Sequence, residues 1–329
     1  MLLKSFIGQE QIKSYFANGF SGNQLGHAYI LAGPQGIGKN TFAGKLAKLL
    51  LCLEPVDNNP CGVCKACSMY DSDVGIDFVT IDESRNSISI DLIRDLQKHI
   101  ILRPAYSKRK VYIIKRAETM TEEAQNCLLK TLEEPPEYAV ILLLTVNPMS
   151  LRETVRSRAV RLDFARYSHS QIRDILLSHG IDAMDKFEYF ENASDGIPGR
   201  ALELASSDKI ETQKDLVFSA IRNCKSNKAG YVALVEMFEK EKAVSAILLD
   251  LAESYFRDLL IIKTGANDAR LINTDKKGII LKDVEGWPIA AIINAIAHIE
   301  SCRKALAQNA NFSNTILVLM LYIQEECNK

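Results

Sequence analysis

Apolar residues in the first half of the chain form short, nearly continuous runs, which alternate with segments whose apolar residues recur at helical spacing. Such runs predict strands buried on both faces, and their alternation with helices is typical of a parallel sheet. The predicted strands are HAYILAG, IDFVTID, KVYIIK, AVILLLTV and AVRLDF. The predicted fold class of residues 1–164 is therefore α/β, a five-stranded parallel sheet with helices on both faces.

The pattern changes after Phe164, where the strand signal stops. Residues 165–207 predict a small domain of short helices. Apolar residues recur at helical spacing again across residues 208–329, for example in LVEMFEKEKAVSAILLDLAESYFRDLLIIK, which predicts an all-helical domain. A division into three domains agrees with a length of 329 residues, which exceeds what one hydrophobic core usually supports.

Charge and hydropathy exclude several classes of protein. The chain has 40 Lys and Arg against 41 Asp and Glu, which argues against coating nucleic acid through bulk charge. The N-terminus MLLKSFIGQEQ does not resemble a secretory signal, and no run approaches the ~18 apolar residues of a membrane helix. We expect a soluble, cytoplasmic protein with no membrane contact.

A glycine-rich motif, GPQGIGKNT, follows the first predicted strand and precedes a predicted helix. It matches G-x-x-x-x-G-K, in which backbone N–H groups and a lysine bind nucleotide phosphates. Asn40 occupies the position where Ser or Thr normally binds magnesium, which weakens magnesium binding. We expect the loop to hold ATP or ADP without hydrolysis; the alternative is a turn that binds nothing. The residues of this predicted site are Gly33, Gly36, Gly38, Lys39, Asn40 and Thr41.

The third predicted strand ends without the acids that hydrolysis requires. A hydrolysing ATPase of this class uses an Asp to orient magnesium and a Glu to polarise the attacking water. In VYIIKRAETM the apolar run is followed by Lys115 and Arg116, and the nearest acids are Glu118 and Glu122. We therefore expect the chain to have no ATPase activity of its own.

Four of the eight cysteines lie within a predicted insert at about residues 52–67. Three of them are spaced C-x-x-C-x-x-C, and four thiolates suit tetrahedral structural zinc. An iron–sulfur cluster would need a cysteine where Asp71 stands, so it remains a weaker alternative, together with unligated thiols. The predicted ligands are Cys52, Cys61, Cys64 and Cys67.

Polar and cationic residues surround the end of the fourth predicted strand. Asn147 stands at the carboxyl end of this strand, where a doubly wound sheet places its ligand, although Pro148 also fits an ordinary turn. The next segment, SLRETVRSRAVRLDF, has four arginines. Any one of them alone is as readily explained by solvation or ion pairing as by function.

The stretch NCLLKTLEEPP, residues 126–136, closely resembles a signature of the clamp-loader subunits of bacterial DNA polymerase III, a family of AAA+ proteins. FIGQEQ, HAYILAGPQGIGK, the four-cysteine insert, VRSR and GIPGRAL occur in the order of that family. The resemblance spans residues 1 to about 206, and the remainder matches in size and pattern. It implies an α/β P-loop AAA+ module, then a helical lid and an all-α collar that oligomerises.

The resemblance also implies a function in DNA replication. It implies a non-hydrolysing stator that assembles with motor subunits (gamma or tau) and a delta subunit, and through this complex acts on the sliding clamp and primed DNA. Arg158 corresponds to an arginine finger that reaches a neighbouring subunit's ATP, with Ala159 replacing the family's Cys. Arg200 corresponds to a lid arginine that senses the γ-phosphate, and Asn147 to a polar sensor.

Two other functions are weighed against the stator. An active ATPase motor subunit of the gamma or tau type is the alternative, and the cations Lys115 and Arg116 argue against it. A zinc-dependent hydrolase would need His and carboxylate ligands with an open coordination position, which the cysteine cluster lacks.

Overall fold

Contacts divide the chain into two compact units in the computed structural model. The first unit comprises Met1–Ile175 with Gly196–Gly199, and the second comprises Leu176–Asp195 with Arg200–Lys329. The structure describes residues 3–22, 25–72, 74–83, 87–182, 187–206, 210–223, 236, 245–265, 271–308 and 310–327.

The three-domain division stays a prediction. Parts of the predicted lid, at 183–186 and 207, lie outside the described residues. The same is true of the predicted collar at 208–209, 224–235, 237–244, 266–270, 309 and 328–329.

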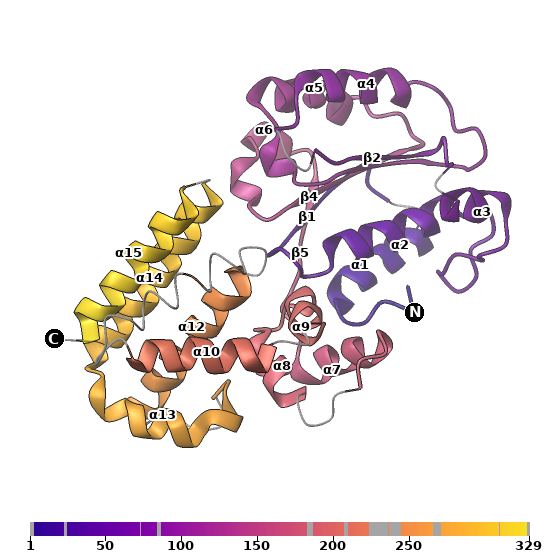
Figure 1. The fold of residues 1–329 in the computed structure, drawn as a ribbon. Helices are drawn as coiled ribbons and strands as arrows, with labels where there is room; N and C mark the ends of the chain where they lie inside the picture. Colours follow the sequence, from indigo (N-terminus) through magenta and orange to yellow (C-terminus); the bar gives the residue numbers. More distant parts are fainter. Residues whose placement is uncertain are drawn as a thin grey trace. The chain divides into compact units, whose positions relative to one another are not determined.

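The first unit is built on one parallel sheet with strand order β2-β3-β4-β1-β5 (Figure 1). All five strands coincide with predicted runs, which confirms the predicted fold class. Every residue of β1, β3 and β4 is buried because helices cover these central strands on both faces, whereas the edge strands are partly exposed. The strands are β1 (Ala28–Ala32), β2 (Phe78–Ile81), β3 (Lys110–Ile114), β4 (Ala139–Thr145) and β5 (Val160–Asp163).

Helices α1 and α2 lie on one side of the sheet and α4 and α5 on the other (Figure 1). On the first side, the Phe16 ring of α1 lies 4.8 Å from the Tyr29 ring of β1 and 6.0 Å from the Phe42 ring of α2. On the second side, buried residues of α4 and α5, among them Leu96 and Leu128, join the strands in one apolar core. The bounds are α1 (Glu10–Ser21), α2 (Lys39–Leu51), α4 (Ile90–Ile100) and α5 (Glu122–Glu133).

Helix α5 carries most of the NCLLKTLEEPP signature. It begins where the Thr121 hydroxyl accepts the Ala124 N–H (3.2 Å), and acids in its first turn favour the helix dipole. Short elements complete the unit: α3 (Lys65–Asp71) in the cysteine insert, the 3₁₀ turns η1 (Ala117–Thr119) and η2 (Pro148–Ser150), and α6 (Glu153–Arg156).

The secondary-structure elements described in the second unit are all helices. Helix α12 packs against α10 and α14, and α14 packs against α15. The buried carboxylate of Asp258 accepts the N–H groups of Ile272 (2.9 Å) and Asn273 (2.7 Å), which fixes the segment after α12. The helices are α8 (Phe187–Ala193), α10 (Ile210–Asn223), α12 (Ser245–Lys263), α13 (Lys277–Asp283), α14 (Ile289–Ala307) and α15 (Phe312–Cys327), with η6 (Thr274–Lys276) and η7 (Val284–Gly286); α7 (His169–Ser178) and α9 (Pro198–Ala205) cross the unit boundary.

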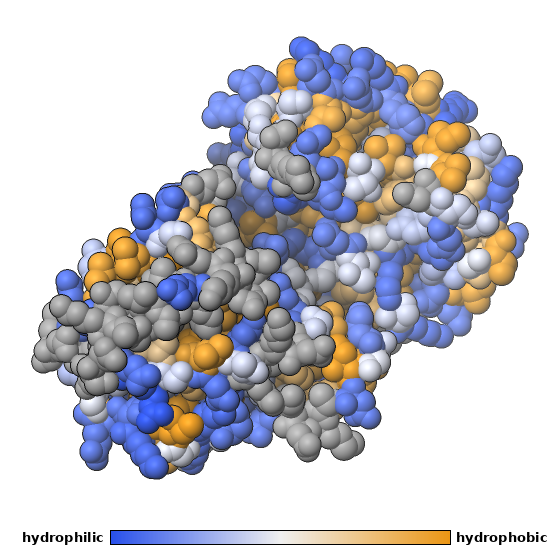
Figure 2. Space-filling model, in the orientation of Figure 1, coloured by the Kyte–Doolittle hydropathy of each residue, from blue (hydrophilic) through white to orange (hydrophobic). Residues whose placement is uncertain are grey.

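Hydrophilic and apolar residues are interspersed on the visible surface (Figure 2). Helix α15 exposes Leu317, Val318, Leu321 and Tyr322 by 38–48%. Among the described helices, none combines the length and apolar character needed to cross a membrane.

Candidate functional site

The predicted phosphate loop connects the carboxyl end of β1 to the N-terminus of α2. Gly36 and Gly38 have φ angles of +79° and +100°, a conformation that favours glycine, and Gly38 directly precedes α2. The first N–H groups of a helix have no intrahelical partner and can bind an anion. Asn40 and Thr41 lie exposed in the first turn of α2. This backbone conformation is compatible with phosphate binding, which stays a prediction.

The ammonium group of Lys39 contacts its own loop. Its Nζ donates to the carbonyl oxygens of Gly33 (2.6 Å) and Pro34 (2.8 Å). Burial lowers the pKa of Lys39, while the negative charge of Glu118 raises it. Glu118 lies in η1 and also accepts the Val146 N–H (3.3 Å) just beyond β4. Sequence reasoning noted Glu118 only as a nearby acid, because its proximity to Lys39 depends on the order of the strands.

Gly199 of the GIPGRAL motif contacts the phosphate loop within the first unit. Its N–H donates to the Gly36 carbonyl (2.9 Å). A Cβ at position 199 would lie 2.8 Å from Gly36 Cα and 2.9 Å from Gly36 O, so a larger residue requires a backbone shift. Gly199 therefore supports the loop, a role that the sequence did not reveal.

Two cations follow β3 where a hydrolysing ATPase would have its acids. Lys115 Nζ lies 3.0 Å from a carboxylate oxygen of Asp82, and Arg116 Nε lies 3.8 Å from the other. Asp82 follows β2, the neighbouring strand. This end of β3 thus presents guanidinium and ammonium groups, which do not bind magnesium.

The two predicted sensor residues have partners of their own. Asn147 Oδ1 accepts the Met149 N–H (3.1 Å), which caps η2. In the second unit, Arg200 pairs with Asp250 (Nη2–Oδ1 2.6 Å), and Asp250 also pairs with Arg303 of α14. These contacts give both side chains a structural role, and their sensor roles stay predictions.

Arg158 lies just beyond α6 and is held by three contacts. Nη1 donates to the carbonyl oxygen of Thr154 (2.9 Å) and to Ser157 Oγ (3.3 Å), and Nη2 lies 2.8 Å from Glu133 Oε1. The side chain is 36% exposed, so part of it remains accessible to solvent. Sequence reasoning missed Glu133, the last residue of α5, although its acid is part of the LEEPP signature.

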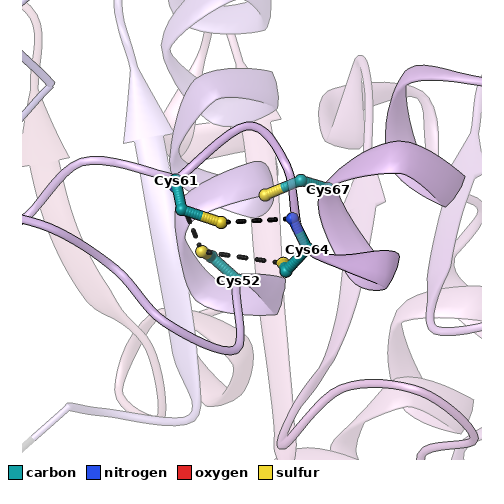
Figure 3. Close-up of side chains that lie close together, drawn as sticks. All are labelled: Cys52, Cys61, Cys64 and Cys67. Atoms are coloured by element: carbon teal, nitrogen blue, oxygen red, sulfur yellow. Dashed lines mark hydrogen bonds between the residues drawn. The ribbon is translucent and has the colours of Figure 1, made fainter.

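The four predicted metal ligands come together in one cluster (Figure 3). Their Sγ atoms all lie within 4.8 Å of one another. The N–H of Cys61 donates to Cys52 Sγ (3.3 Å), and the N–H of Cys64 donates to Cys61 Sγ (3.3 Å). Cys52 follows α2, Cys61 and Cys64 lie in the connecting loop, and Cys67 lies in the first turn of α3.

The chemistry of this cluster fits a closed tetrahedral site. Zinc–thiolate bonds of about 2.3 Å place the sulfurs of such a site about 3.8 Å apart, and Cys52 Sγ lies 4.0 Å from Cys64 Sγ. Burial raises the pKa of Cys67 to about 12. Burial also raises the pKa of Cys64, but N–H donors from Leu53 and Cys67 outweigh it and lower that pKa to about 6. A cation would stabilise all four thiolates.

Fold and site together define an α/β protein with a glycine-rich loop between β1 and α2 and a cluster of four cysteines that could hold a metal ion. The model of the family "DNA polymerase III, delta subunit" matches residues 8–168, and that of "DNA polymerase III, delta subunit, C terminal" matches residues 210–325. The chain belongs to this DNA polymerase III subunit family.

Several relatives are similar over different lengths. Subunit delta' of DNA polymerase III from Bacillus subtilis is 28% identical over 321 residues, 96% of each chain, which supports the resemblance of the sequence to delta-prime subunits. Subunit tau/gamma from Haemophilus influenzae is 36% identical over 166 residues, 50% of this chain and 24% of that protein. The chain spans 24–47% of the length of the first three tau and gamma relatives.

A gamma-subunit-related protein from Thermotoga maritima has a solved structure with 18% sequence identity and a TM-score of 0.45. The match covers 97% of this chain and 99% of that one.

Proposed function

We propose that this chain is a non-hydrolysing stator of the DNA polymerase III clamp loader, of the delta-prime type. It assembles with gamma or tau motor subunits and with delta, and the complex loads the sliding clamp onto primed DNA during replication. The similarity to the delta' subunit of Bacillus subtilis along 96% of the chain supports this proposal.

The observation that carries the proposal is the pair of cations after β3. Lys115 and Arg116 pair with Asp82 at the edge where magnesium and the attacking water would need acids. Asn40 weakens magnesium binding further, since an amide is a poorer magnesium ligand than a carboxylate or hydroxyl. The phosphate loop keeps Lys39 and its glycines, so it holds ATP or ADP without hydrolysing it.

In this proposal Arg158 acts on the ATP of a neighbouring motor subunit. Its side chain is 36% exposed, and an arginine supplied in trans stabilises transition-state charge by a factor on the order of a thousand or more. The apolar side chains exposed on α15 suit the role of the helical collar in assembly. The four-cysteine cluster holds zinc, which four thiolates coordinate tetrahedrally. This zinc is structural, because a site with four protein ligands leaves no coordination position for substrate.

A motor subunit of the gamma or tau type is the second candidate. Identity of 36% to tau/gamma over half the chain and the intact Lys39 favour it. The acids missing after β3 argue against it, because a motor requires them.

One experiment separates the two candidates. ATP binding and ATP hydrolysis are measured separately, first for the purified chain with primed DNA and clamp, then for the assembled loader. The stator shows negligible turnover alone, whether or not nucleotide binds. Robust magnesium-dependent turnover by the isolated chain would establish the motor instead.

A further inference from the structure

We infer that Glu133 is a positioning residue for Arg158: it presents the guanidinium of the finger in a fixed orientation. This inference rests on the proposed function, in which Arg158 acts in trans. The juxtaposition that carries it is the contact of 2.8 Å between Glu133 Oε1 and Arg158 Nη2.

The C-terminal end of α5 attracts a cation for two reasons. Glu133 is the last residue of this helix and Glu134 follows it, so two carboxylates add to the negative end of the helix dipole. Acids in this position destabilise a helix unless a cation compensates them. Lys130 in the last turn and Arg158 supply cations there, and the direct contact with Glu133, not the general charge of this helix end, determines where the guanidinium lies.

The contacts of Arg158 fix both the position and the orientation of its guanidinium group. The Thr154 carbonyl and Ser157 Oγ bind Nη1, while Glu133 binds Nη2, so two different nitrogens are held from two different elements. Arginine loses considerable side-chain entropy when it is ordered. A guanidinium that is ordered beforehand does not lose this entropy when it meets phosphate.

The segment that carries Arg158 is itself fixed to α5. The Arg152 N–H donates to the side chain of Gln125 (2.8 Å), and Arg152 Nη1 contacts Glu122 (3.3 Å). Helix α6 is thus attached to the first turn of α5 at one end and to its last residue at the other. Because α6 is fixed to α5 at both ends, Glu133 is better suited to orient Arg158 than to compete with phosphate for it.

The test uses Glu133→Gln in the fully assembled loader, with single-turnover hydrolysis of pre-bound ATP. Arg158→Ala first identifies the kinetic phase that depends on the finger, since it removes that phase. We expect Glu133→Gln to slow the same phase about two- to fivefold, the range of a half-exposed ion pair. ATP affinity should not change, because the finger acts in the transition state.

Two controls distinguish positioning from a general structural effect. Glu134→Gln removes the same charge one residue away, at a carboxylate that makes no ion pair within the described residues, and should leave the phase unchanged. The double variant Glu133→Gln/Arg158→Ala should hydrolyse ATP at the same rate as Arg158→Ala alone, because Glu133 acts only through Arg158. Glu133→Asp keeps the charge and should recover part of the rate.

The outcomes separate this inference from the proposed function. If Arg158→Ala slows no phase, both the finger and its positioning are wrong. If Arg158→Ala slows a phase that Glu133→Gln leaves unchanged or accelerates, the finger stands and the positioning role is overturned. Subunit assembly and circular dichroism of each variant show whether it is folded.

Discussion

Substitution of Gly199 by alanine tests the contact between the GIPGRAL motif and the phosphate loop. The added methyl group would lie 2.8 Å from Gly36 Cα and 2.9 Å from Gly36 O. These atoms are backbone, so no side chain can rotate away to make room. One of the two segments must shift, and the hydrogen bond between Gly199 N–H and Gly36 O (2.9 Å) lengthens with it.

The size of the effect follows from three contributions. Overpacking costs about 1–3 kcal/mol, and a weakened hydrogen bond costs about 0.5–1.5 kcal/mol. Replacement of glycine also restricts the unfolded chain, which offsets about 0.4–1 kcal/mol. The free energy of local opening of the loop should therefore fall by about 0.5–4 kcal/mol, which corresponds to about 2- to 1,000-fold faster amide exchange in the loop.

Hydrogen exchange measured by mass spectrometry resolves the affected region. Peptides covering residues 33–41 and 196–205 should exchange faster in Gly199→Ala than in the unchanged protein. The single tryptophan, Trp287, lies in the second unit, and its fluorescence during denaturation provides an internal reference. Its denaturation midpoint should not move.

A matched control is available at Gly278 in α13, where a Cβ meets no atom within 4 Å. Gly278→Ala should stabilise that helix by about 0.5–1 kcal/mol and leave the loop unaffected. If Gly199→Ala leaves exchange of both peptides unchanged, the contact does not constrain the loop and the steric reasoning is refuted.

Further predictions concern the metal cluster and pH. The purified protein should be colourless and contain one equivalent of zinc, and a chelator should lower the thermal midpoint of the first unit; a brown protein absorbing near 400 nm would contradict zinc. Cys61→Ser should lose zinc, whereas Cys127→Ser, outside the cluster, should retain it. Burial, and then the charge of Lys110, lower the pKa of His99. The unfolded chain therefore binds more protons, and stability should fall as pH decreases below about 6.5. Denaturation at pH 7.5 and 5.5 should show a smaller decrease for His99→Gln, and an equal decrease would exclude His99 as the cause.

Local sequence pattern was sufficient for the strands, the phosphate loop and the cysteine cluster. Parallel strands that are buried on both faces have nearly continuous apolar sequences, so the five apolar runs were sufficient to predict the five strands. The three cysteines from Cys61 to Cys67 lie within one short segment, and chain connectivity alone keeps them close. Helix α1 did not appear in the prediction, although FIGQEQ at its start was noted as part of the family pattern.

Contacts between distant segments could not be obtained from the sequence. Glu133 and Arg158 are 25 residues apart, and their pairing requires α5 and α6 to pack side by side. The influence of Glu118 on Lys39 depends on the strand order β3-β4-β1, which places the ends of β3 and β1 on either side of β4. Gly199 is far along the chain from Gly36, and its need for glycine appears only when the two backbones meet.

The sequence by itself determined the five strands and the residue types at the predicted sites, including the cations after β3 and an amide in place of a hydroxyl at Asn40. These properties depend on residue type and on spacing within a few residues, which the chain preserves whatever its fold. Only the tertiary structure decided the partners of those residues: Asp82 for Lys115, Glu118 for Lys39, Asp250 for Arg200 and Glu133 for Arg158. Electrostatic and steric effects act over a few ångströms in space, and packing, not sequence order, sets those distances.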